Sequence, residues 1–468
     1  MNDAPKTLQS ASGSSGGIPP GYAPGFRWRR GRNWFFLGLL YAAYYLCRYN
    51  LNTVTPELAH EFKFDNNQTG WMSTTRDFGY AIGTFINGLF SDALGGKQSM
   101  AIGALGTIAM NLLFGYTSTT GMVAKWLLIS FLAIRFLDGY MQAFGSPGMV
   151  KINTSWFKRR ERGKFAGVFG GMIQLGQMGV NLLSSKLLTG FSIVLFGTTL
   201  FAVQKQNWRI MFVLPPILLA IILILAWLNV KNHPEEAGYK IEHDDDVHQE
   251  NPNERLPLAF VLKTIISNKL IWINAGAYFC TGFVRRAYDF WWAKYLWDAW
   301  AVGKDSGIFK WLGVLLPLSG FLGSFGSGFI SDTLFKGRRS PVAAGLYGLE
   351  TVVILSAFLI LGPLHMGSPI LAGVFLFLIS LTCNSSHSII GTAAVMDIGG
   401  RKMAGFALGV VNSLQYWGAI LAGSMLGALI DRYGWSALFA AMVPFSALGM
   451  VLMASLAIRT RGRDVKGS

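Results

Sequence analysis

The feature that most constrains this chain is a series of about 12 apolar runs, each long enough to cross a lipid bilayer, spread over 468 residues. A transmembrane helix needs about 20 mostly apolar residues. Only 14% of the residues are charged, which is too few for a surface that faces water everywhere. The pattern predicts an all-α polytopic membrane protein, with runs near 34–54, 71–91, 98–118, 124–148, 164–190, 209–230, 268–292, 308–331, 341–362, 369–396, 403–429 and 435–457.

Basic residues lie in alternate loops and so predict how the chain is oriented. The net charge of +16 could suggest a nucleic-acid ligand. However, the basic residues lie in short segments between runs, as the positive-inside rule expects on the cytoplasmic side; the richest are 27–32, 158–164, 336–339 and 459–463. We therefore expect both termini in the cytoplasm, no nucleic-acid partner, and a multi-pass protein of the plasma membrane, of the bacterial inner-membrane type.

Polar stretches divide the chain into two halves. Residues 1–30 are rich in Gly, Ser and Pro and predict a disordered cytoplasmic tail. The polar segment 231–262 predicts a cytoplasmic connector. It separates a first six-helix half at 31–230 from a second at 263–458, and 459–468 form a basic cytoplasmic tail. All three cysteines lie inside apolar runs, so we expect no disulfide framework.

The two halves repeat each other. The pattern Gly88-x3-Asp92 recurs as Gly328-x3-Asp332, an offset of 240 residues (328 − 88). Repeats with an even number of crossings keep the same orientation. Parallel six-helix repeats are the architecture of the major facilitator superfamily, in which substrate binds at the repeat interface. The sequence therefore predicts two pseudo-symmetric six-helix halves.

The loop after the second run resembles the superfamily motif G-x3-D-x2-G-x-[K/R], with matches at Gly88, Asp92, Gly95 and Lys97. Glycine permits a tight turn or close packing, and the aspartate can pair with a basic residue or cap a helix. Such a pair would stabilise one conformer. We expect Asp92 and Lys97, with Asp332 in the second half, to act in gating rather than in substrate binding.

Arginines lie inside the membrane-spanning runs at nearly equivalent points of the two halves. A charge within a span costs ~2.5–3.5 kcal/mol on insertion scales, so it usually faces a cavity or a partner. Arg48 lies late in the first run, and Arg285 and Arg286 lie late in the seventh. One guanidinium from each half would form a clamp for a dianion. The alternative is that these side chains extend toward the interface.

Several segments carry a resemblance to the organophosphate:phosphate antiporters, which include glycerol-phosphate and hexose-phosphate transporters. The run Tyr41-Ala-Ala-Tyr44-Tyr45-Leu-Cys-Arg48 is similar to the first helix of that family. Residues 139–163 resemble its fourth helix and following loop, and residues 405–418 with 431–435 resemble its eleventh helix and last loop. The resemblance spans roughly residues 30–460 and implies a transporter with the major facilitator fold.

The resemblance also implies roles for individual residues. Arg48 and Arg285 map onto the two arginines that bind phosphate in the family, with Arg286 as a register alternative. Asp397, near the end of the tenth run, maps onto an acidic residue that we expect to form a gating salt bridge. The cavity tyrosines of the family map onto Tyr41, Tyr45, Tyr80 and Tyr416.

The chain departs from the family at three places. The second-helix lysine and fifth-helix histidine of the family fall at Thr84 and Ile173. Its Gly-Trp-Pro-Pro-Cys-Gly-Arg run survives only as 145–151, which ends in the basic Lys151. We expect Lys151 to have a gating or structural role. Arg76 lies on the same helical face as Tyr80 and could restore a positive charge at the site. It could equally belong to an ion pair with its neighbour Asp77.

We interpret the sequence as a secondary transporter that exchanges an organic phosphate for inorganic phosphate by alternating access. The organic phosphate would be a sugar phosphate, a glycerol phosphate or a phosphoglycerate. We expect a monomer without a cofactor or a metal. Enzymes are not indicated, because the sequence has no Gly-rich phosphate loop followed by Lys-Ser/Thr and no His-Glu-x-x-His. Its one Gly-x-Ser-x-Gly match, at 13–17, lies in the Gly/Ser-rich N-terminal tail and not between a strand and a helix.

Two alternatives stay open. A proton-coupled symporter of a carboxylate or sugar would need a titratable coupling residue, for which Asp77, Glu350 and His387 are candidates. A transporter-like sensor would bind a sugar phosphate and signal to a membrane kinase.

Overall fold

The computed structural model describes residues 24–157, 159–195, 198–239, 267–335, 338–364, 366–394 and 411–460. Of the residues predicted to act in gating, Asp397 lies outside these ranges, and the side chains of Asp92 and Asp332 lie outside the description as well.

The first half is a bundle of six membrane-spanning units, each of which coincides with a predicted run. The fourth unit is broken, because α4 ends at Gln142 and α5 begins at Gly145. The sixth begins with a short 3₁₀ turn, η1 (Trp208–Phe212). The helices are α1 (Phe26–Phe62), α2 (Asn66–Leu94), α3 (Gly96–Thr117), α4 (Ala124–Gln142) with α5 (Gly145–Trp156), α6 (Arg159–Leu188) and α7 (Leu214–Asn229).

The second half repeats this plan after a 3₁₀ turn, η2 (Pro234–Ala237), and the connector. The tenth predicted run is α12, which continues into a π-helical turn, η3 (Ile389–Ala394). The eleventh is a helical segment at 411–421 followed by α14. The helices of this half are α9 (Lys269–Trp300), α10 (Gly307–Leu334), α11 (Arg339–Leu361), α12 (Pro369–Ser388), α14 (Ser424–Tyr433) and α15 (Ser436–Thr460).

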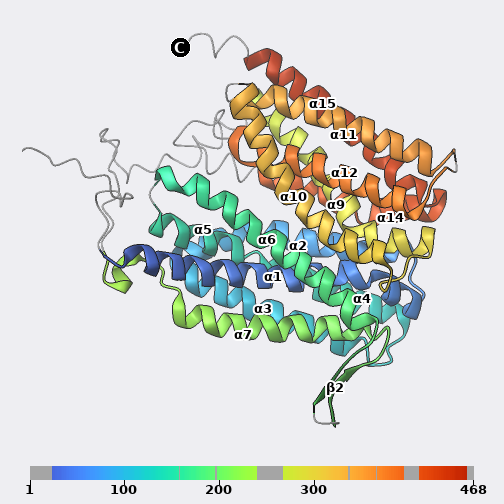
Figure 1. Ribbon diagram of the computed structural model, residues 1–468, viewed down its shortest axis with the longest axis horizontal. Coiled ribbons are helices and arrows are strands. Elements are labelled where there is room, and N and C mark those ends of the chain that lie inside the picture. Colours follow the sequence, from blue (N-terminus) through green and yellow to red (C-terminus); the bar gives the residue numbers. More distant parts are fainter. Residues whose placement is uncertain are drawn as a thin grey trace, which may run out of the picture.

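One feature departs from the predicted all-α fold. Between α6 and η1 the chain forms an antiparallel hairpin of β1 (Phe191–Leu195) and β2 (Thr198–Val203). The hairpin starts near one end of the bundle and projects sideways from it, past α7 (Figure 1). Its sequence is rich in β-branched and aromatic residues, which favour strands, and each segment is far too short to span a membrane.

Eight helical units of the described chain are long and apolar enough to cross a membrane. Four other long helices, α1, α2, α6 and α9, do not meet that standard because polar and aromatic residues interrupt their apolar stretches. These four helices contain Arg48, Arg76, Gln177 and Arg285, which meet in the centre of the molecule. The polarity of the four helices therefore marks the surfaces that face inward.

The two halves lie side by side and meet along three helix pairs, α1 with α9, α2 with α14, and α6 with α10. The start of α1 and the end of α15 lie at the same end of the bundle, at the left of Figure 1, which we call the terminal end. The β-hairpin lies at the opposite end, which we call the hairpin end. The hydrogen bonds described between the halves run from mid-helix to the hairpin end.

Glycines let α2 and α14 pack closely at the hairpin end. A Cβ atom added to Gly70 would lie 2.4 Å from the carbonyl oxygen of Gly423, and one added to Gly427 would lie 2.3 Å from that of Asn66. Asp431 of α14 accepts hydrogen bonds from the backbone N–H groups of Asn66 and Asn67 at the start of α2. A carboxylate of one half thus caps a helix of the other.

A buried ion pair adds to this closure. The ammonium group of Lys304, in the loop between α9 and α10, contacts the carboxylate of Glu57 near the end of α1, and both side chains are almost fully buried. The carbonyl oxygen of Lys304 accepts a hydrogen bond from Ser185 of α6 at 2.9 Å. One short loop of the second half is therefore held by two helices of the first.

Candidate functional site

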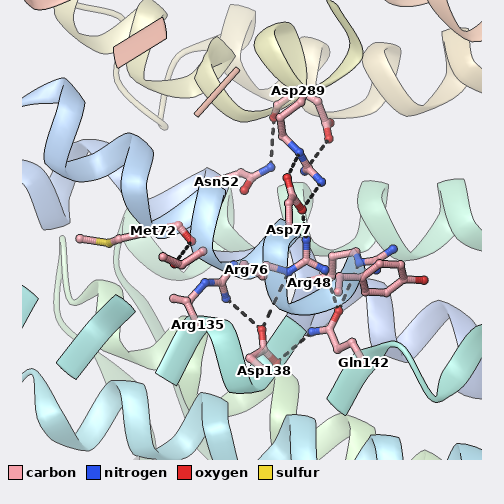
Figure 2. Close-up of polar contacts among 12 residues, drawn as sticks. Arg48, Asn52, Met72, Arg76, Asp77, Arg135, Asp138, Gln142 and Asp289 are labelled. Carbon is pink, nitrogen blue, oxygen red and sulfur yellow. Dashed lines mark hydrogen bonds and ion pairs between the residues drawn. The ribbon is translucent and has the colours of Figure 1, made fainter. Parts of the chain in front are cut away.

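Buried charged side chains form a band across the middle of the molecule (Figure 2). They come from the polar helices α1, α2 and α9 and from the more apolar α4, and so from both halves. A charge in this position is stable only where it is paired or faces a polar cavity. The contacts of each side chain separate these two cases.

Arg48 of α1 faces a cavity. Its Nη1 donates to the hydroxyl of Tyr45 at 3.1 Å and its Nε donates to Oε1 of Gln142 at 3.2 Å. The guanidinium lies 4.2 Å from the ring centroid of Tyr80, which gives a cation–π contact. Among the described residues, Arg48 forms no salt bridge with a carboxylate. Neutral groups orient it, and its charge remains available to an anion.

Tyrosines surround Arg48 as the resemblance implies. Tyr41 and Tyr45 lie one turn apart on α1 with ring centroids 5.5 Å apart. Tyr80 packs against Tyr416 across the interface of the halves, at 4.9 Å between centroids. The predicted set is therefore brought together around one guanidinium.

Arg285 of α9 is held by a histidine. Its Nη1 lies 3.1 Å from Nε2 of His387, and Nδ1 of that ring lies 3.2 Å from the side-chain amide of Gln415. A guanidinium can only donate, so Nε2 must accept, and a neutral ring then carries its proton on Nδ1. A rotation of the Gln415 side-chain amide turns its oxygen toward the ring, and the N–H at Nδ1 then donates to that oxygen. His387 thus serves as a neutral acceptor that orients Arg285.

Both arginines line the same cavity between the halves. Its empty volume is about 460 Å³. The lining residues are Tyr45, Arg48, Tyr49, Gly282, Arg285, Arg286, Asp289, Gln415, Tyr416 and Ala419. The structure thus places one predicted clamp arginine from each half, with two of the predicted tyrosines, around one polar space.

Arg286 differs from Arg285, although the two are adjacent in sequence. Its Nε lies 2.7 Å from Oδ2 of Asp77, and its Nη2 donates to Oδ1 of the same residue at 2.7 Å. This bidentate ion pair joins α9 to α2 and so joins the two halves. Arg286 borders the cavity, but its charge is balanced by Asp77.

Arg76 is also paired. Its Nη1 donates to Asp77 at 3.0 Å and its Nη2 donates to Oε1 of Gln142 at 3.0 Å. It does not line the cavity, and its residue is 2% exposed. Of the two interpretations left open by the sequence, the geometry favours the ion pair. Arg76 is therefore connected to the cavity through Gln142, which also contacts Arg48, and through Asp77, which pairs with Arg286.

Arg135 pairs with Asp138 one turn later in α4, with 3.1 Å between Nη1 and Oδ2. Asp138 also accepts from Gln142 and from Asn111. This carboxylate therefore anchors the amide that holds Arg48 and Arg76.

Two predicted gating residues lie near the terminal end of the first half. Lys151 of α5 donates to the carbonyl oxygen of Ser91 at 3.1 Å, close to the C-terminal end of α2, where a cation is favourable. The ammonium group of Lys97 lies 4.4 Å from the ring centroid of Trp227. Both residues connect helices within the first half.

Sequence reasoning missed Tyr49, Gln415 and Asp289 as cavity residues. Tyr49 and Asp289 each follow a predicted site residue by one helical turn, namely Tyr45 and Arg285, so spacing could have identified both. The role of Gln415 depends on how two helices of the second half pack, which spacing along one helix does not reveal.

Comparison with known proteins agrees with this architecture. The family model of the Major Facilitator Superfamily matches residues 37–423. A probable hexose phosphate transport protein of Chlamydia trachomatis is 26% identical over 444 residues, with 91% of each chain covered. A glycerol-3-phosphate transporter of Bacillus subtilis is 26% identical over 436 residues, with 91% of this chain and 92% of the relative covered. The membrane sensor protein UhpC of Escherichia coli is 24% identical over 422 residues, with 88% and 89% covered.

The family match covers most of the chain, the helices form two repeated halves, and the charged cavity lies between them. The relatives named here are two membrane transport proteins and a membrane sensor, and none is an enzyme. The relatives' names agree with the resemblance to the organophosphate:phosphate antiporters. This multi-pass membrane protein belongs to the Major Facilitator Superfamily.

Proposed function

We propose that this protein exchanges an organic phosphate for inorganic phosphate across a bacterial inner membrane, and that Arg48 and Arg285 bind the phosphoryl group. The observation that carries the proposal is that these two arginines, one from each half, line a single cavity while neutral groups orient both of them. A guanidinium held in this way can form bidentate hydrogen bonds with phosphate oxygens.

The charge of the central cluster supports a doubly charged ligand. Five guanidiniums face three carboxylates, which leaves two positive charges, carried mainly by Arg48 and Arg285. A phosphate monoester dianion neutralises them. The cluster consists of Arg48, Arg76, Arg135, Arg285 and Arg286 with Asp77, Asp138 and Asp289.

The same charges provide a reason for exchange rather than net flow. In the empty carrier the two clamp arginines repel each other and oppose the approach of the halves. A bound phosphate removes that repulsion, so the loaded carrier changes conformation more readily than the empty one. The positive-inside rule assigns the terminal end to the cytoplasm. The packing at the hairpin end then corresponds to a conformer closed toward the outside.

The test uses two preparations of proteoliposomes, one loaded with inorganic phosphate and one without it. Uptake of labelled phosphate is followed in both. We expect uptake only in loaded vesicles, and we expect Arg48→Ala and Arg285→Ala each to abolish it. Immunodetection and a thermal unfolding curve check insertion and folding of the variants. Full exchange by a correctly inserted Arg48→Ala protein would disprove the clamp.

The same experiment separates the alternatives. Uptake into empty vesicles that depends on a proton gradient would indicate a symporter. Saturable binding of a sugar phosphate without any uptake would indicate a sensor, a function named in one of the relatives.

A further inference from the structure

A second, smaller cavity adjoins the cavity that holds the two clamp arginines. It is narrow, with room for about one water molecule or hydroxyl group. The two cavities share Arg285 and Asp289. The other lining residues of the smaller cavity are Gln174 and Gln177 of α6, Tyr288 of α9, Leu316 of α10, and Ser380 and Asn384 of α12. Arg285 therefore lies at the junction, with the phosphate cavity on one side and a space lined mainly by amides and hydroxyls on the other.

Amide groups of this smaller cavity have unused hydrogen-bonding capacity. Among the described residues, the side chain of Gln174 forms no hydrogen bond, and none reaches Oε1 of Gln177 or Oδ1 of Asn384. These atoms are not fully buried, because each keeps some accessible surface. Atoms of this kind can accept from, or donate to, the hydroxyl groups of a ligand.

Hydrogen bonds hold two of the three amides in place. Gln177 donates to Oδ1 of Asp289 at 2.5 Å, and Asn384 donates to the hydroxyl of Tyr288 at 2.8 Å. Gly320 of α10 leaves room for Gln174, because a Cβ atom there would lie 2.5 Å from Nε2 of that amide. A site with fixed polar groups selects ligands by their hydrogen bonds.

Charge distinguishes two types of organic phosphate at this site. Arg285 is the single cation among the described residues that line the smaller cavity, and Asp289 contributes a carboxylate. With Arg285 bound to the phosphoryl group, a second acidic group such as the carboxylate of a phosphoglycerate would face Asp289 without a cation of its own. Hydroxyl groups, in contrast, can donate to that carboxylate.

We propose that Gln174, Gln177, Asp289 and Asn384 form a hydroxyl-binding subsite, so that the organic substrate is a polyhydroxylated phosphate monoester and not a phosphocarboxylate. The proposal rests on the proposed function, because it takes the phosphoryl group to lie between Arg48 and Arg285. It adds which residues bind the organic group and which class of organic phosphate binds poorly.

The test compares a polyhydroxylated and a carboxylated phosphate monoester in the purified full-length protein. Glucose 6-phosphate and 3-phosphoglycerate are titrated by calorimetry, and both are used as competitors of labelled phosphate exchange in proteoliposomes. We expect glucose 6-phosphate to bind at least about tenfold more tightly. Gln174→Leu, and Gly320→Ala, which displaces the Gln174 amide, should each weaken glucose 6-phosphate about tenfold relative to inorganic phosphate.

A matched control is Ser184→Ala, because this buried serine of α6 bonds only the carbonyl oxygen of Asn181 in its own helix and lines neither cavity. Ser184→Ala should leave the affinity for glucose 6-phosphate relative to inorganic phosphate unchanged. A protein that exchanges phosphate but accepts both ligands equally would overturn the subsite and leave the proposed function intact. The same holds if Gln174→Leu weakens glucose 6-phosphate and phosphate by the same factor. Failure to exchange or bind phosphate at all would instead remove the proposed function, and the subsite with it.

Discussion

At the scale of single residues, Gln142 shows how one neutral side chain organises two charges. Its Oε1 accepts from Arg48 and from Arg76, while its Nε2 donates to Asp138. Both ends of the amide are therefore fixed, and Arg48 is oriented without being neutralised. A carboxylate at this position would pair with Arg48 and compete with an incoming phosphate.

Replacing a clamp arginine by lysine separates charge from geometry. Arg48→Lys and Arg285→Lys keep the positive charge but lose the planar fork that matches two phosphate oxygens. We expect kcat/KM for phosphate exchange to fall by about 10- to 100-fold in each variant. Transport kinetics in proteoliposomes measure this, with the exposed Arg432→Lys as the control. Wild-type kinetics in either clamp variant would show that charge alone is sufficient.

The histidine beside Arg285 gives a prediction about pH. Because His387 accepts from Arg285 through Nε2, its neutral form is the one that fits the site. Glutamine offers an acceptor of similar reach, so His387→Gln should exchange phosphate with the same dependence on pH between about 5 and 8 as the wild type. The measurement is labelled phosphate uptake at fixed internal pH. A wild-type pH step that vanishes in His387→Gln would identify this histidine as a titrating, proton-coupling group.

At the scale of elements, the sequence predicted the helices well and the contacts between them poorly. The predicted runs coincide with twelve helical units, because the length and apolar character of a span are local properties. Eight of these units are apolar enough to qualify as spans by themselves. Hydropathy could not separate Arg285 from Arg286, since adjacent residues on a helix point about 100° apart and their partners lie on other helices. The partners are His387 of α12 for one and Asp77 of α2 for the other.

The close contact of α2 with α14 yields a packing prediction. In Gly70→Ala the new methyl group would collide with the backbone of Gly423, where no flexible side chain can move aside. We expect the closed hairpin end to be destabilised by about 1–3 kcal/mol. Labelling of a cysteine introduced at the hairpin end should then increase. Gly326→Ala is the control, because a Cβ atom there meets nothing within 4 Å. Equal labelling in the two variants would contradict the prediction.

At the scale of the whole molecule, the two halves are joined through charges that also reach the substrate cavity. Arg286 of the second half pairs with Asp77 of the first, Asp77 pairs with Arg76, and Arg76 shares Gln142 with Arg48 (Figure 2). The contact between the halves and the orientation of a clamp arginine therefore belong to one network. A ligand that moves Arg48 changes the surroundings of the ion pair that joins the halves.

This continuity predicts that Asp77 and Arg286 are coupled in their contributions to stability. The stability losses of the two single variants should together exceed the loss of the double variant. Asp77→Ala leaves Arg286 and Arg76 buried without their shared carboxylate, and removing one partner of a buried pair costs about 3–5 kcal/mol. The double variant Asp77→Ala/Arg286→Ala removes charges of both signs. We therefore expect it to be more stable than Asp77→Ala in thermal unfolding, and less closed at the hairpin end than the wild type in cysteine labelling. Additive losses of stability in the double variant would mean that the two residues act independently.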